Sequence, residues 1–171
     1  MSQRARPARP APVRPGPGQE SVWDYPRPPR LERTAALIEV VLGGVTVART
    51  DQALRVLETS HPPTYYLPRS AFETGSLTPA GGRSFCEWKG VAVYFDVVGG
   101  TEVAARAAWG YPRPTPPFAA LLQHVAVYPG AMDSCTVDGE VVLPQPGGFY
   151  GGWVTSTVVG PFKGDAATRF W

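Results

Sequence analysis

The sequence predicts a compact, single-domain, mainly β fold of short antiparallel strands with one or two short helices. Three observations lead to this fold class. Short apolar segments alternate with turn signals, three pairs of such segments flank two-residue glycine turns, and few stretches suit a helix. Two-residue turns that need positive φ are typical of β-hairpins. We expect the strands to form a distorted barrel or a layered sheet.

Each predicted hairpin follows from its turn. Leu37–Val41 and Val45–Ala48 flank Gly43-Gly44, Val91–Val98 and Thr101–Ala107 flank Gly99-Gly100, and Cys135–Val137 and Glu140–Leu143 flank Asp138-Gly139. Asp-Gly is a strong signal for a type I′ turn. Further strands are predicted at Tyr65–Leu67, Arg83–Trp88, Val125–Tyr128 and Trp153–Val159.

Helix is predicted at two places. Asp51 is suited to cap a short helix over Gln52–Glu58, whose apolar residues would share one face. The pair Pro62-Pro63 prevents that helix from continuing. Phe118–His124 is expected to form one or two helical turns.

Composition divides the chain into a leader and one folded domain. A chain of 171 residues is long enough for one domain with an ordinary core. Residues 1–19 consist mainly of Arg, Pro, Ala and Gly, with little to bury, so they are predicted to be a disordered leader. Residues 20–171 are predicted to be a single β domain.

The charge distribution argues against a nucleic-acid-binding domain. Six arginines against Glu20 and Asp24 give residues 1–30 a net charge of +4, whereas the whole chain carries +2. The folded part is therefore slightly acidic, which is not the pattern of a nucleic-acid-binding face. No stretch approaches the roughly 18 apolar residues of a membrane helix, and no signal peptide is recognisable. We expect a cytoplasmic protein that binds neither nucleic acid nor membrane.

Cysteine and histidine are too few for a metal site. The two cysteines, Cys86 and Cys135, do not form a disulfide framework, and we expect reduced thiols. No C-x-x-C or H-x₃–₅-H spacing occurs, and neither the P-loop nor the dinucleotide fingerprint is present. We therefore predict no metal and no cofactor.

Three residues are candidates for chemistry. His61, fixed by the prolines that follow it, is suited to act as a general acid or base. Lys89 is suited to hold an anionic or carbonyl oxygen. Cys86 is a candidate nucleophile that His61 would activate. For each residue the alternative is structural: a histidine at a helix end, a lysine paired with Glu87, and a cysteine packed in a strand.

Aromatic residues are candidates for the walls of a pocket. Tyr65 and Tyr66 should face opposite sides of a strand, one toward the core and the other available to a ligand. The segment Gln145–Trp153 is a glycine-rich aromatic loop that can close over a ligand or pack on the sheet. The predicted ligand-binding residues are Tyr65, Tyr66, Trp88, Trp109, Tyr111, Tyr150 and Trp153.

Six stretches of the chain also match sequence motifs of a known family. They are V-L-E-T-S-H-P-P-T-Y-Y-L-P (Val56–Pro68), F-C-E-W-K-G (Phe85–Gly90), A-A-W-G-Y-P (Ala107–Pro112), V-A-V-Y-P-G (Val125–Gly130), Q-P-G-G-F-Y-G-G-W (Gln145–Trp153) and G-P-F-K-G (Gly160–Gly164). Over roughly Glu20 to Trp171 the chain resembles domain-of-unknown-function family 427. The resemblance implies a β-tent fold similar to that of Mss4-like proteins. The zinc-binding cysteine pairs of those proteins are absent here.

Three functions remain open from the sequence. The first is binding of an unknown small molecule in an aromatic-lined pocket, with possible acid/base enzyme activity. The alternative is a non-catalytic protein-interaction or homodimerisation module that uses the Pro-rich leader and two similar Trp-Tyr-Pro segments, Trp23–Pro28 and Trp109–Pro114. The third is nucleotidyl transfer, a label that some classifications attach to the family. Its acidic pair for Mg²⁺ has no counterpart after Gly43-Gly44.

Overall fold

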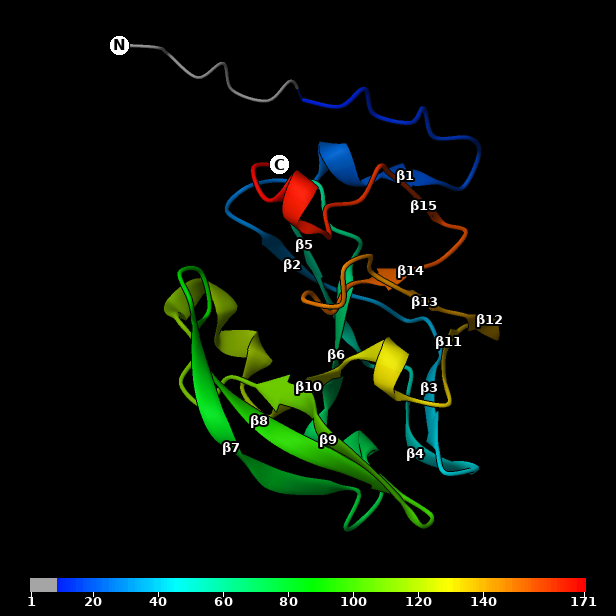
Figure 1. The fold of residues 1–171 in the computed structure, drawn as a ribbon, viewed down its shortest axis with the longest axis vertical. Coiled ribbons are helices and arrows are strands. Elements are labelled where there is room, and N and C mark those ends of the chain that lie inside the picture. The colour runs from blue at the N-terminus through cyan, green and yellow to red at the C-terminus, as the bar shows by residue number, and fades with distance from the viewer. Residues whose placement is uncertain (1–8) are drawn as a thin grey trace.

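The structure is a computed structural model that describes residues 9–171, and two open antiparallel sheets make up most of it (Figure 1). The seven-stranded sheet has the order β2 (Arg30–Arg33), β5 (Leu54–Leu57), β6 (Thr64–Pro68), β10 (His124–Val127), β9 (Glu102–Gly110), β8 (Gly90–Gly99) and β7 (Leu77–Cys86). The four-stranded sheet has the order β12 (Glu140–Val141), β11 (Ser134–Val137), β3 (Ile38–Leu42) and β4 (Val45–Thr50).

Short elements complete the fold. Two strand pairs join distant segments: β1 (Glu20–Ser21) with β15 (Val158–Val159), and β13 (Leu143–Pro144) with β14 (Trp153–Val154). The helical segments of residues 9–171 are 3-10 turns: η1 (Val22–Asp24), η2 (Arg69–Ala71), η3 (Pro116–Leu121), η4 (Pro129–Ala131) and η5 (Ala166–Thr168). The prediction of a mainly β domain with only short helices is confirmed.

The three predicted hairpins are present. β3 pairs with β4, β8 with β9, and β11 with β12, all antiparallel. Asp138 and Gly139 both have positive φ, as a type I′ turn requires. The first two hairpins also touch each other, because a Cβ on Gly43 would lie 1.9 Å from the Gly99 carbonyl oxygen. The β8–β9 turn is shifted by one residue from the prediction, since Gly99 ends β8 opposite Glu102 and the turn is Gly100-Thr101. Gly43 and Gly99 allow the two sheets to meet.

The predicted helix over Gln52–Glu58 is wrong, because this segment contains strand β5. β5 lies between β2 and β6, and its hydrogen bonds are satisfied on both sides. Leu54, Val56 and Leu57 are all buried. The spacing of Ala53, Leu54 and Leu57 suited one face of a helix, but two neighbouring strands supply partners that the local sequence does not reveal.

Smaller differences concern element ends. Helical structure near Phe118 is confined to η3, and His124 already begins β10. The predicted strand Arg83–Trp88 ends at Cys86, because the next three residues form the turn into β8. Of the predicted strand Trp153–Val159, only β14 and β15 form.

The two faces of the seven-stranded sheet have different roles. One face packs against the four-stranded sheet around Ile38, Val40, Leu67 and Val97. The other face carries an aromatic cluster and is covered in part by η3. A strand places successive side chains on opposite faces, so the central strands β6, β8, β9 and β10 contribute to both clusters. The candidate site lies on this second, aromatic face.

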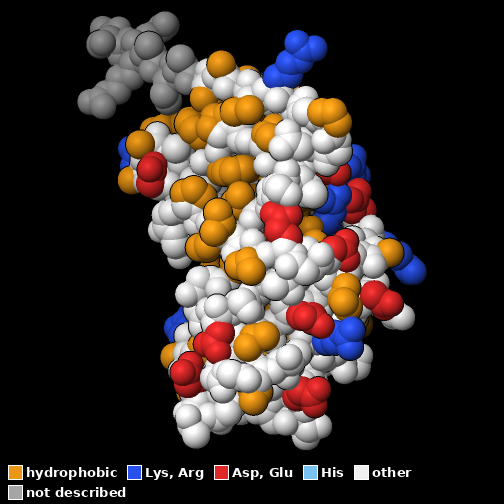
Figure 2. All heavy atoms as spheres, turned by 90° about the vertical axis from the view of Figure 1, so that its right-hand side faces the viewer, with side chains coloured by type: hydrophobic (Ala, Val, Ile, Leu, Met, Phe, Trp, Pro, Cys, Tyr) orange, Lys and Arg blue, Asp and Glu red, His pale blue; other side chains and the backbone are white. Residues whose placement is uncertain are grey.

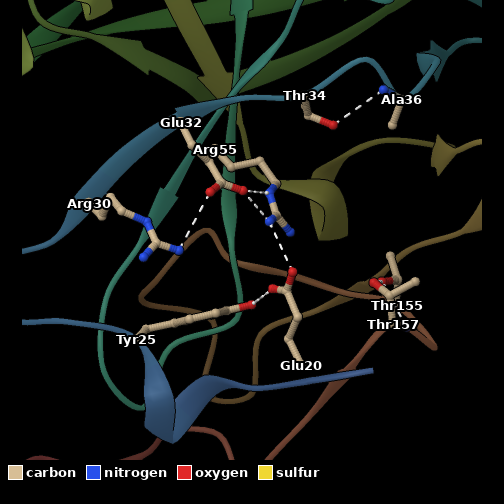
Figure 3. Close-up of polar contacts among 9 residues, drawn as sticks. All are labelled: Glu20, Tyr25, Arg30, Glu32, Thr34, Ala36, Arg55, Thr155 and Thr157. Carbon is tan, nitrogen blue, oxygen red and sulfur yellow. Dashed lines mark hydrogen bonds and ion pairs between the residues drawn. The ribbon is translucent and has the colours of Figure 1, made fainter. Parts of the chain in front are cut away.

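A paired charge network ties the N-terminal strands to this sheet (Figure 3). The Arg55 guanidinium donates to Glu32 through Nε at 3.0 Å, and it also donates to Glu20 at 3.3 Å. The Tyr25 hydroxyl donates to the other Glu20 carboxylate oxygen at 2.6 Å. Arg30 lies 3.5 Å from Glu32. Each carboxylate thus has two partners.

The predicted leader lies partly outside the described residues, since 1–8 are not among them. Residues 9–19 have no regular secondary structure and are mostly exposed, and the Val13 N–H donates to the Gly160 carbonyl at 2.8 Å. Figure 2 shows the side that carries the four-stranded sheet, with hydrophobic side chains gathered in its upper half and charges of both signs in its lower half. None of the helical segments in residues 9–171 has the length and apolar character to cross a bilayer.

Candidate functional site

A cavity of about 900 Å³ lies on the aromatic face of the seven-stranded sheet. Its floor comes from β6, β8 and β9, and its two sides come from the β7–β8 turn and from residues 145–151 with Lys163. In Figure 1 the tip of the β7–β8 hairpin stands to the left, and the orange segment that contains residues 145–151 lies to its right. Segments far apart in the chain therefore enclose one space.

Aromatic rings form a large part of the cavity wall. Tyr66 lies edge-on to Trp109, with ring centroids 6.3 Å apart, and tilted against Tyr111 at the same distance. Trp109 also packs on Tyr128 at 4.5 Å. Burial raises the pKa of the Tyr66 and Tyr111 hydroxyls, so both stay protonated near neutral pH. The wall thus combines flat apolar surface with hydroxyl donors.

Two of the predicted ligand-binding residues are not part of this wall. Tyr65 and Tyr66 point to opposite faces of β6, and Tyr65 packs against Trp153 with ring centroids 4.9 Å apart. Trp153 is fully buried and donates from its indole nitrogen to the Val127 carbonyl at 3.3 Å. Both rings belong to the core between the two sheets, whereas Trp88 and Tyr150 line the cavity.

His61 lines the cavity with both ring nitrogens bonded. Its Nε2 lies 3.4 Å from Glu58 Oε2, and its Nδ1 lies 3.0 Å from Gln145 Nε2. The Gln145 amide cannot turn round, because its oxygen accepts from Gly152 N–H and its nitrogen donates to the Lys163 carbonyl. Gln145 therefore donates to Nδ1, and neutral His61 carries its proton on Nε2, facing Glu58. In this conformation His61 links its neighbours rather than offering a free base.

Glu58 is the acceptor at the centre of this group. Besides His61, Arg27 donates to its Oε2 at 3.2 Å. Burial alone would raise the pKa of the Glu58 carboxyl, but the hydrogen bond from His61 and the charges of Arg27 and Lys89 hold it below the ordinary 4.5. Glu58 is therefore an anion at neutral pH, with its partners already in place.

Lys89 is held in the cavity by the β7–β8 turn. Its carbonyl accepts from Thr115 N–H at 3.1 Å, and the Thr115 hydroxyl donates to the Trp88 carbonyl, so η3 fixes the turn from outside. The Lys89 side chain is nine-tenths buried, and its ammonium lies 5.8 Å from the Tyr111 ring centroid and 5.9 Å from that of Phe118. Within residues 9–171 no hydrogen bond or ion pair involves this ammonium.

Two predicted interactions, Glu87 with Lys89 and Cys86 with His61, are not formed in residues 9–171. Glu87 is exposed, and no ion pair within residues 9–171 joins it to Lys89. Cys86 is partly exposed in the cavity wall, but its thiol forms no hydrogen bond with His61 in the described part of the chain. Cys135 is a buried free thiol in the core, where burial raises its pKa to about 12. In the described residues, no base is hydrogen-bonded to the Cys86 thiol.

The glycine-rich loop covers one side of the cavity. Tyr150 lies edge-on to His61, with ring centroids 4.7 Å apart, and the Lys163 ammonium lies 5.6 Å from the Tyr150 centroid. Gly151 lies directly on Trp109, where a Cβ would be 2.1 Å from Cη2 of the indole. The loop approaches the wall this closely only because Gly151 has no side chain.

Sequence reasoning missed several lining residues. Glu58 lies three residues before His61, and Gln145 is the first residue of the glycine-rich loop. The sequence motifs pointed to His61 and to the loop aromatics, and not to these two residues. The spacing of Glu58 and His61, three residues apart before two prolines, was the available signal for a bonded turn. Tyr94, Tyr128 and Lys163 carried no local signal, because they join the cavity only through the sheet order and the return of the C-terminal segment.

Comparison with known proteins bears on identity. A search among curated proteins found no match to the chain. A family described as "Domain of unknown function (DUF427)" has a model that matches residues 30–138. The match includes His61 and the segment from Cys86 to Lys89, together with the aromatic wall, but ends before the glycine-rich loop. Since the match spans more than half of the chain, the protein belongs to the DUF427 family.

Proposed function

We propose that this protein binds a small organic molecule with a flat apolar part in the cavity beside the β7–β8 turn. The observation that carries the proposal is the composition of the cavity. It is about 900 Å³ in volume and combines many aromatic rings with charged and polar side chains around its edge. Ligand sites in proteins are typically of this size and character.

The wall itself indicates how such a ligand would lie. The rings of Tyr66, Trp109 and Tyr128 contact one another on the sheet and present apolar surface to the cavity. A flat ligand can stack on or lie edge-on to these rings, which contributes about 0.5–1.5 kcal/mol for each ring pair beyond the area that it buries. Tyr150, on the loop, supplies a ring from the opposite side.

Binding is better supported than catalysis. His61, Cys86 and Lys89 all line the cavity. A general base, however, needs a free nitrogen within reach of the ligand, and both nitrogens of His61 bind Glu58 and Gln145. An acid/base role for His61 would require the Gln145 amide to move away first. We therefore propose His61 as a residue that positions the loop against β6.

The test is a thermal-shift screen of a metabolite library against the wild type and two threonine variants. Thr64→Trp places a large side chain in the cavity wall, whereas Thr46→Trp makes the same change at an exposed position of β4 in the other sheet. A ligand at about 100 times its dissociation constant stabilises by about 2.7 kcal/mol. For a domain of this size that raises Tm by about 5–10 °C.

The proposal expects hits that shift the wild type and Thr46→Trp but not Thr64→Trp. Hits that shift all three proteins equally would place binding elsewhere. A library without hits, at concentrations that cover millimolar affinities, would contradict the proposal.

The alternative of an interaction or homodimerisation module has less support. The aromatic residues of the two Trp-Tyr-Pro segments, Trp23, Tyr25, Trp109 and Tyr111, are all buried inside the described chain. They are thus not available as the centre of a contact with another protein. Sedimentation at micromolar concentration tests this alternative, which requires a species larger than the monomer.

A further inference from the structure

We propose that the ligand carries an anionic oxygen group, a carboxylate or a phosphate, and that this group binds Lys89. The inference rests on the proposed function and specifies the class of ligand: a flat aromatic or heteroaromatic acid. Lys89 would hold the acid group at one side of the cavity while the ring lies on the aromatic wall.

The first argument is the missing partner. A buried charge is costly unless it is paired and hydrogen-bonded. Residue Lys89 is nine-tenths buried and lines the cavity, and the described neighbours of its ammonium are the ring faces of Tyr111 and Phe118, each almost 6 Å away. Ring faces at that distance compensate only weakly for lost hydration. Among residues 9–171 the ammonium has no ion-pair partner, so an anion that enters the cavity can bind it directly.

The second argument is that the carboxylates nearest to Lys89 either have other partners or are exposed to solvent. Two carboxylates line the cavity, Glu58 and Glu87. Glu58 already accepts from Arg27 and His61, and Glu87 is exposed to solvent. Neither neutralises Lys89 by direct contact within residues 9–171. Lys89 acts on Glu58 only from a distance, as one of the charges that lower the Glu58 pKa, so its ammonium can still bind an anionic ligand directly.

The third argument is the rigidity of the position. Thr115 bonds the backbone of the β7–β8 turn at Lys89 and at Trp88. Behind the side chain lies Phe118, which is buried in η3. Because the ammonium is placed before binding, little conformational freedom is lost when an acid group arrives.

The tyrosine hydroxyls of the cavity wall are compatible with an anionic group on the ligand. Burial keeps Tyr111 and Tyr66 protonated, so their hydroxyls can act as donors and do not repel an anion. Lys163, the second lysine of the cavity, is instead directed to the Trp171 carbonyl, to which it donates at 3.4 Å. One free ammonium suits a ligand with one acid group. It does not suit a triphosphate, whose several charges need several donors.

The experiment compares acids with their neutral amides. The probes are benzoate and benzamide, 2-naphthoate and naphthalene-2-carboxamide, and indole-3-carboxylate and indole-3-carboxamide, with 2-naphthyl phosphate as the phosphate arm. Affinity is measured by calorimetric titration with the wild type and with two single-charge variants. Lys89→Met removes the ammonium but keeps an apolar stem, and Arg83→Met removes one exposed charge from β7, outside the cavity lining.

We expect the wild type to prefer at least one anion over its amide by tenfold or more. Lys89→Met should abolish this preference, while Arg83→Met should keep it. The stronger of 2-naphthoate and 2-naphthyl phosphate then identifies the acid group. Equal binding of acids and amides, or a preference that survives in Lys89→Met, overturns the inference.

Failure here is distinguishable from failure of the proposed function. If no acid binds but the library yields a neutral ligand that Thr64→Trp blocks, the acid group is wrong and the cavity remains a binding site. If neither the probes nor the library binds, both proposals fall.

Discussion

Arg55 and Lys89 are both largely buried cations, and their surroundings are opposite. Arg55, on β5, has an exposed side-chain fraction of 13% and bonds Glu20 and Glu32, which are in turn held by Tyr25 and Arg30 (Figure 3). Lys89 is 9% exposed and has neither an ion pair nor a hydrogen bond from its ammonium within residues 9–171.

The difference indicates that Arg55 stabilises the fold, whereas Lys89 is available to a ligand. At Arg55 the chain satisfies every charge with its own groups, so this region is complete without a ligand. At Lys89 the charge faces a cavity that the chain leaves open. A buried charge without a partner is unfavourable for stability, and such features are more frequent where a protein binds or reacts. The same contrast can be tested by removing each cation.

Removing Arg55 should have the largest effect. Arg55→Met leaves Glu20 and Glu32 together without their shared partner. We expect a loss of about 2–4 kcal/mol in the free energy of unfolding, below the value for fully buried pairs because both carboxylates are partly exposed. Urea denaturation measures it. Arg49→Met, which breaks the exposed pair with Glu39, should cost less than about 1 kcal/mol. Equal losses in the two variants would mean that the Arg55 network stabilises the fold no more than an exposed ion pair does.

Closing the space between the loop and Trp109 should have the next largest effect. Gly151→Ala would place a Cβ 2.1 Å from the Trp109 indole, so the loop or the ring must shift. We expect a destabilisation of about 1–3 kcal/mol, together with a change in tryptophan fluorescence. Gly81→Ala is the matched control, since its Cβ would meet nothing within 4 Å. A neutral result at Gly151 would show that the loop moves away from Trp109 easily.

Removing Lys89 should have an effect of the opposite sign. Lys89→Met replaces a largely buried lysine, whose ammonium has no ion pair within residues 9–171, by an apolar side chain of similar length. We expect the ligand-free protein to be unchanged or up to about 2 kcal/mol more stable in urea denaturation. A loss comparable to that of Arg55→Met would contradict the comparison, because Lys89 would then have a structural partner.

The smallest effect concerns acid stability. The pKa of Glu58 is lower in the folded protein than its ordinary value of 4.5. Such a carboxyl stabilises the fold above the unfolded pKa, and this contribution disappears as the pH falls through the folded pKa. In Glu58→Gln, the difference in unfolding free energy between pH 7 and pH 3 should therefore be smaller than in the wild type. Glu39→Gln, on the exposed β3 pair, is the control, and an equal change in both would remove the role assigned to Glu58.

Much of the candidate site could be predicted as a set of residues. The stretch with His61, the segment from Cys86 to Lys89, and the glycine-rich loop with Tyr150 all border one cavity. Rigid prolines, clustered aromatics and a glycine run mark these stretches locally. Whether a residue faces the cavity could not be predicted, and Tyr65 and Trp153 pack in the core instead. Side chains alternate along a strand, but the orientation of the strand in the sheet decides which set faces the cavity and which faces the core.

The sequence alone determined the hairpins, because the φ values of Gly43-Gly44 and Asp138-Gly139 are properties of those residues and of their immediate neighbours. The tertiary structure decided the rest. It made Gln52–Glu58 part of a sheet, since β2 and β6 provide hydrogen-bond partners from outside the segment. It also decided which charges are paired. Arg55 finds Glu20 from 35 residues away, whereas Lys89 finds no such partner in the described chain, because pairing depends on distances that only the folded sheet creates.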